Sequence, residues 1–178
     1  MLKGIIRESI GKKEAKALRR DGYLVANIYG KGLENISAAF KSNEYIRTVK
    51  NKDSIAFDID LDGKELKVVV QEYQVHPLSG DLVHVDLMVA QPGVVSKYMV
   101  PVVTTGEAIG LKNKGLLYVA KNRLAVKAKV EDLPANITVD VTPLDLGDSI
   151  LVRDLETPAN TNFMDADRVA VLSIIKAK

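Results

Sequence analysis

The sequence predicts a mainly β protein made of two domains. Apolar residues alternate with other residues in several short runs, and this period of two is typical of half-buried strands. The 178 residues suit one large domain or two of about 90. Gln91-Pro92-Gly93 interrupts both kinds of regular structure. We therefore place a domain boundary there, between residues 1–92 and residues 93–178.

Two segments in the first domain break the strand pattern and predict short helices. Lys12 to Arg20 consists of good helix formers, with Gly11 before it and Asp21-Gly22 after it as start and stop signals. A second helix is predicted from Ser42 to Lys50, and Ser42 or Asn43 is its expected cap.

The strands of the first domain include a β-hairpin over residues 54–75. Asp62-Gly63 separates its two alternating runs, and both residues of this pair tolerate the positive φ that a two-residue turn requires. Alternation also predicts strands at residues 36–40 and 83–89.

The second domain reads as an all-β sandwich or open barrel, because short strands recur between glycines and prolines. Its predicted strands span residues 98–105, 124–130, 137–141, 149–152 and 169–175.

Composition limits the possible functions. Hydrophobic residues make up 47% and charged residues 27% of the chain, as in packed globular proteins. The lack of cysteine excludes disulfides, zinc–thiolate sites and thiol catalysis, and fits a reducing compartment. The N-terminus has no signal-peptide core, and no segment approaches membrane-spanning length. We expect a soluble cytoplasmic protein with no membrane partner.

Positive charge is concentrated at the start of the chain. Residues 1–50 hold 11 Lys and Arg against 5 Asp and Glu, whereas residues 51–100 hold 4 against 8. The predicted first helix contributes Lys12, Lys16, Arg19 and Arg20 at spacings of three and four, so several of them share a face. Such a face can contact successive phosphates of a nucleic acid, although a solvated helix surface is an equally simple interpretation.

Two further groups of residues could bind RNA. Tyr29 stands beside glycines and Lys31, where it could stack on a base, or it could be a core residue before a flexible turn. His84 and Asp86 are two apart in a strand and project from one face, so they could form a binding contact, a structural pair or a metal-assisted hydrolase site. No catalytic set accompanies them, and His76 before Pro77 is expected in a turn.

One acidic motif resembles the start of a calcium loop. Asp58, Asp60, Asp62 and Gly63 fit its opening, but Val69 stands where the loop needs a bidentate glutamate. A strand with an acidic outer face that ends in a turn explains the motif better. We therefore expect no metal site, no cofactor and no catalytic residues.

The order and spacing of these pieces resemble a bacterial family of 5S-ribosomal-RNA-binding proteins, known as Ctc or general stress protein, the two-domain form of large-subunit ribosomal protein number twenty-five. The resemblance covers nearly the whole chain. One position departs from the family pattern: Val25 stands where the family usually has a proline. Its motifs include Ala17-Leu18-Arg19-Arg20-Asp21-Gly22, Ala26-Asn27-Ile28-Tyr29-Gly30-Lys31-Gly32, His76-Pro77, His84-Val85-Asp86 and Leu146-Gly147-Asp148-Ser149.

The resemblance implies an N-terminal β-barrel with short helices that binds 5S ribosomal RNA, followed by a second all-β domain. It also implies a non-enzymatic protein of the ribosome whose partners are 5S RNA and large-subunit proteins, and which is a monomer when free. The alternative is a stress-linked protein-interaction module with secondary RNA binding. Together, the resemblance and the charge pattern give the expected RNA-binding residues: Arg7, Lys12, Lys16, Arg19, Arg20, Tyr29, Lys31, Gln71, His84 and Asp86.

Overall fold

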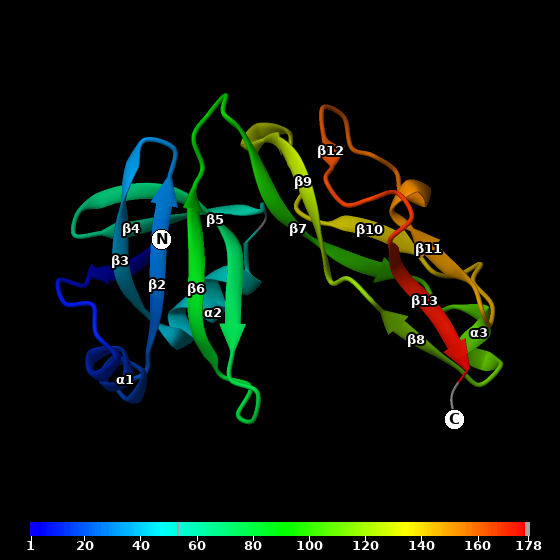
Figure 1. Ribbon diagram of the computed structural model, residues 1–178, viewed down its shortest axis with the longest axis horizontal. Helices are drawn as coiled ribbons and strands as arrows, with labels where there is room; N and C mark the ends of the chain where they lie inside the picture. Colours follow the sequence, from blue (N-terminus) through cyan, green and yellow to red (C-terminus); the bar gives the residue numbers. More distant parts are fainter. Residues whose placement is uncertain (53, 177–178) are drawn as a thin grey trace. The chain divides into compact units, whose positions relative to one another are not determined.

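The computed structural model describes residues 1–52 and 54–176, which form two compact units, Met1–Val94 and Val95–Lys178 (Figure 1). The mainly β prediction is confirmed, with a barrel in the N-terminal region and a second β unit after it. No helix of the described residues has the length and apolar character needed to cross a bilayer.

Six strands close the barrel of the first unit in the order β1-β3-β2-β6-β5-β4. Most neighbours are antiparallel, but β1 pairs with β4 and β2 pairs with β6 in parallel. The elements in chain order are β1 (Leu2–Ile6), α1 (Lys12–Arg20), β2 (Tyr23–Gly30), β3 (Leu33–Lys41), α2 (Ser42–Lys50), β4 (Ala56–Leu61), β5 (Lys64–Val75) and β6 (Leu82–Val89).

Both predicted helices are present with the predicted bounds. The cap expected for α2 is wrong, because the helix begins at Ser42 itself and Lys41 precedes it without a capping side chain. Tyr45 of α2 is buried, and its ring meets Phe57 edge-on with centroids 6.4 Å apart. This contact attaches α2 to the barrel core.

The hairpin prediction is also confirmed. Strands β4 and β5 are antiparallel neighbours, and Asp62 and Gly63 turn between them with φ of 50° and 84°. The carboxylate of Asp60 accepts a hydrogen bond from the Gly63 N–H at 2.9 Å. Val25 does not break β2, because it pairs with both Ala39 and His84.

Strand β1 was not predicted from the sequence. Its apolar residues are few and flanked by charges, and it is a strand because it lies between β3 and β4. Gly4 allows this close approach, since a Cβ atom there would lie 2.4 Å from the ring of buried Phe40. The barrel core also contains Leu24, Ile28, Ile59, Leu61, Val68, Val85 and Leu87.

The second unit holds two sheets, in the orders β10-β7-β9-β12 and β11-β13-β8. All five predicted strands are present, whereas α3, β8 and β12 were not predicted. The elements are β7 (Val95–Thr105), α3 (Ile109–Lys112), β8 (Gly115–Val119), β9 (Arg123–Lys129), β10 (Ile137–Asp140), β11 (Ser149–Leu151), β12 (Asn162–Phe163) and β13 (Ala170–Lys176), with 3₁₀ turns η1 (Val130–Asp132) and η2 (Val152–Asp154).

Candidate nucleic-acid interface

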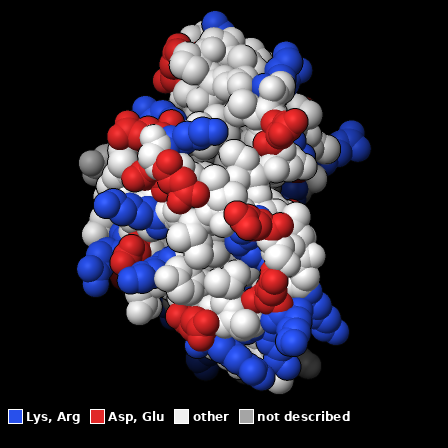
Figure 2. Space-filling view, turned by 90° about the vertical axis from the view of Figure 1, so that its left-hand side faces the viewer, with Lys and Arg blue, Asp and Glu red and all other residues white. Residues whose placement is uncertain are grey.

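Helix α1 presents cations to solvent along its length. It has no buried residue, and Lys12, Lys16, Arg19 and Arg20 are all exposed. Figure 2 shows Lys and Arg gathered at the lower end of the view, where α1 lies, and mixed with acidic residues above. Arg19 and Arg20 occupy the last turn, where positive charge complements the negative end of the helix dipole.

Arg19 connects this helix to the barrel. Its Nε donates a hydrogen bond to the carbonyl of Val83 at 3.0 Å, and Val83 directly precedes His84 on β6. The helix also packs against β2, the parallel neighbour of β6. The cations of α1 therefore lie beside the β2–β6 pair.

The register of β2 and β6 brings distant polar residues together. Asn27 is opposite Asp86, and Tyr29 is opposite Met88. The alternate residues Ala26, Ile28, Val85 and Leu87 are buried in the core, so the other set points to the outer face. That set is Asn27, Tyr29, His84 and Asp86.

The outer face has an acidic centre. His84 Nδ1 lies 3.6 Å from Asp86 Oδ1, which is an ion-pair distance for a protonated imidazole but too long for a hydrogen bond. Partial burial raises the pKa of Tyr29, and the charges of Asp86 and then Glu72 raise this pKa further. The Tyr29 hydroxyl therefore remains protonated at neutral pH, close to two carboxylates.

Strand β5 adds residues on the other side of β6. Gln71 lies at a β-bulge, and its Oε1 is buried without a hydrogen-bond partner among the described residues. After the bulge, Glu72 is opposite Asp86 and Gln74 is opposite His84. Asn27, Glu72 and Gln74 were not predicted as site residues, because a bulge and the strand register cannot be read from the period of two.

Arg7 lines a cleft with Glu14 and Leu18 of α1, on the side of the helix opposite its cations, whereas Lys31 lies away from α1. Arg7 Nη2 donates to the carbonyl of Ser9 at 3.4 Å, and its Nε is buried with no partner in the described part of the chain. Arg7 and Tyr29 line one cleft of about 540 Å³. Lys31 is exposed at the end of β2 remote from α1, so it does not join the helix cations.

The remaining titratable motifs have structural roles. His76 lies in a turn as predicted, where its Nδ1 accepts a hydrogen bond from the Ser79 N–H at 3.2 Å. Asp58 and Asp60 lie on β4 opposite Lys67 and Glu65. In residues 1–52 and 54–176, no three His, Asp or Glu side chains are grouped to hold a metal ion.

Comparison with known proteins agrees with this two-part organisation. Residues 2–87 match the family model described as Ribosomal L25p family, and residues 96–178 match that described as Ribosomal protein TL5, C-terminal domain. Proteins named "Large ribosomal subunit protein bL25" are similar to the chain over the full length of both partners. Identity is 66% for Sulfurimonas denitrificans, 60% for Campylobacter lari and 57% for Wolinella succinogenes.

Similarity at this level over all 178 residues decides the class of the protein. It removes the hydrolase interpretation of His84 and Asp86, because the relatives are ribosomal proteins and not enzymes. The chain is therefore a non-enzymatic, ribosome-associated protein of the cytoplasm, and it belongs to the ribosomal L25p family.

Proposed function

We propose that this chain is a structural constituent of the large ribosomal subunit and that residues 1–92 bind 5S ribosomal RNA. One observation carries the 5S proposal: the β2–β6 register places Tyr29, His84 and Asp86 on one outer face, beside a cationic helix. The other partners of the chain are RNA and proteins of the large subunit. The free protein is a monomer.

The chemistry of this face matches that of an irregular RNA helix. Such RNA offers a wide minor groove, 2′-hydroxyl groups and unpaired base edges, and these provide donors for a carboxylate and acceptors for a phenol or imidazole. Cations beside the face can neutralise phosphates, which fix position without reading sequence. The residues assigned to riboses and bases are Tyr29, Gln71, His84 and Asp86. The residues assigned to phosphates are Arg7, Lys12, Lys16, Arg19, Arg20 and Lys31.

The test is a filter-binding titration of the full chain with 5S RNA, using transfer RNA as competitor. We expect 5S RNA to be preferred, and its affinity to fall steeply as salt rises because bound cations release counterions. Equal affinity for the two RNAs would contradict the proposed function.

Arg20→Gln should weaken 5S binding and lower the slope of log affinity against log salt by about one. Arg20 suits this test better than Arg19, whose Nε also holds α1 to Val83. Arg47→Gln is the matched control, because it removes an exposed arginine from the last turn of α2. If Arg20→Gln and Arg47→Gln lowered the salt slope equally, the effect would come from net charge and not from the position of Arg20.

Deletion of residues 93–178 separates RNA binding from the stress-linked protein-interaction alternative. The barrel is closed and has its own core, so we expect the shortened chain to fold and to retain its 5S affinity within about threefold, or ~0.7 kcal/mol. Circular dichroism checks the fold, and the same titration measures affinity. Loss of RNA binding by a folded residue 1–92 fragment would contradict the domain assignment.

A further inference from the structure

Charge is sharply divided within the second unit, although its total is nearly balanced. Residues 97–129 contain seven Lys and Arg and one Glu, whereas residues 130–168 contain two Arg and nine Asp and Glu. The first segment includes β7 and β9, which are antiparallel neighbours in one sheet. Four of the seven basic residues lie on these two strands: Lys97 on β7, and Arg123, Lys127 and Lys129 on β9.

Three of these lysines share the outer face of the β7–β9 pair. Lys97 is directly opposite Lys127, and Lys129 is opposite Val95. The alternate residues, among them Tyr98, Leu124, Val126 and Ala128, are buried. Lys97, Lys127 and Lys129 therefore project to the other side, where all three are exposed. We call these three residues the lysine face.

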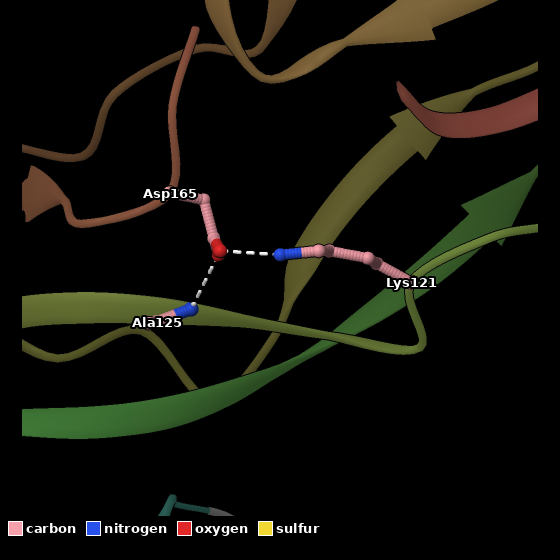
Figure 3. A network of polar contacts seen from close by, with 3 residues as sticks. All are labelled: Lys121, Ala125 and Asp165. Carbon is pink, nitrogen blue, oxygen red and sulfur yellow. Dashed lines mark hydrogen bonds and ion pairs between the residues drawn. The ribbon is translucent and has the colours of Figure 1, made fainter. Parts of the chain in front are cut away.

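No carboxylate forms a direct ion pair with the lysine face in the described part of the chain, and only Lys97 interacts with one, Asp165, at longer range. The nearby carboxylate of Asp165 is engaged elsewhere: it pairs with Lys121, and its Oδ2 accepts the Ala125 N–H at 3.1 Å (Figure 3). Partial burial alone would raise the pKa of Asp165, but these hydrogen bonds and the charges of Lys121 and Lys97 lower it. Asp165 therefore stays ionised yet does not pair with Lys97.

Facing like charges destabilise a sheet, so a bound anion would relieve the repulsion between Lys97 and Lys127. Acidic groups of the same sheet are distant, since Asp140 pairs with Thr105, eight residues and about 27 Å along β7 from Lys97. Glu131 and Asp132 follow β9 in η1, after the strand has ended. Neither group is opposite the lysine pair.

We infer that the lysine face is a second RNA-binding site, which holds the phosphate backbone of ribosomal RNA. Lysines are depleted in protein–protein interfaces, whereas flexible ammonium groups on neighbouring strands can each reach a phosphate. Such contacts fix position without reading sequence. The C-terminal unit thus adds a sequence-independent RNA contact that is separate from the proposed 5S interface.

The test compares full-length proteins on an RNA duplex of poly(A) and poly(U). One variant carries Lys97→Gln, Lys127→Gln and Lys129→Gln; the control carries Lys112→Gln, Lys114→Gln and Lys176→Gln, which remove equal charge from the same unit. We expect the first variant to lower the slope of log affinity against log salt by about two to three, and the control by less than one. Equal slopes for the two variants, or no change in the first, would overturn the inference.

A variant with one charge reversal keeps the inference testable if the triple variant fails to fold. Lys127→Glu replaces a repulsion with an attraction to Lys97, so the thermal midpoint should rise while duplex affinity falls. A lower midpoint would contradict the facing of the two lysines. The duplex results do not depend on 5S binding. If the unchanged chain showed no preference for 5S RNA, the proposed function would be wrong. The salt slopes on the duplex would still show whether the lysine face binds RNA.

Discussion

Replacement of Phe40 by alanine should destabilise the first unit by about 3–5 kcal/mol, the range for truncation of a buried phenylalanine. Phe40 is fully buried in the barrel core, and its ring occupies the space beside Gly4 of β1. The cavity would open between β1 and β3, which are paired at these two residues. Because whole domains are stable by only about 5–15 kcal/mol, much of this unit would unfold under mild conditions.

Urea unfolding followed by NMR measures this effect for each unit separately. Ile10→Ala is the control, because Ile10 is 78% exposed and its truncation should change stability by less than about 0.5 kcal/mol. Signals of the second unit, which has its own core, should keep their midpoint. If Phe40→Ala unfolded at the same urea concentration as the unchanged chain, this result would contradict the described packing of β3 on β1.

Asp86→Ala should reduce affinity for 5S RNA by roughly 10-fold to 100-fold, the equivalent of one or two hydrogen bonds to a charged acceptor. The direction is informative, because removal of negative charge from a surface that binds a polyanion should by itself increase affinity. A loss can therefore come only from a specific contact. The same variant should bind an unrelated RNA duplex as well as before or better.

The tyrosine titration verifies that Asp86 acts from the described position. Asp86 raises the pKa of Tyr29, so this pKa should fall in Asp86→Ala. Glu72→Gln is the matched variant from the opposite strand, and it should also lower the pKa of Tyr29. If Asp86→Ala bound both RNAs more tightly, Asp86 would only repel RNA and would make no specific contact with it.

Local features of the fold were predictable because their signals lie within a few residues. The bounds of α1 follow from helix formers between Gly11 and Asp21, and the β4–β5 hairpin follows from Asp62-Gly63. Barrel closure is different, because the parallel partners of β1 and β2 are strands more than fifty residues further along the chain. A single sequence carries no direct signal for such pairings.

The candidate site was predictable in part for the same reason. His84 and Asp86 share a strand, and their spacing alone places them on one face. The approach of Glu72 to Tyr29 depends on the bulge at Gln71 and on the order of three strands. Lys97 and Lys127 are thirty residues apart, so their pairing also required the structure.

Each of the six barrel strands is hydrogen-bonded to a neighbour on both sides. Exposed strand edges are the usual template on which two copies of a β protein join and aggregate. The closed barrel of the N-terminal unit therefore presents no such template to a second copy of the chain.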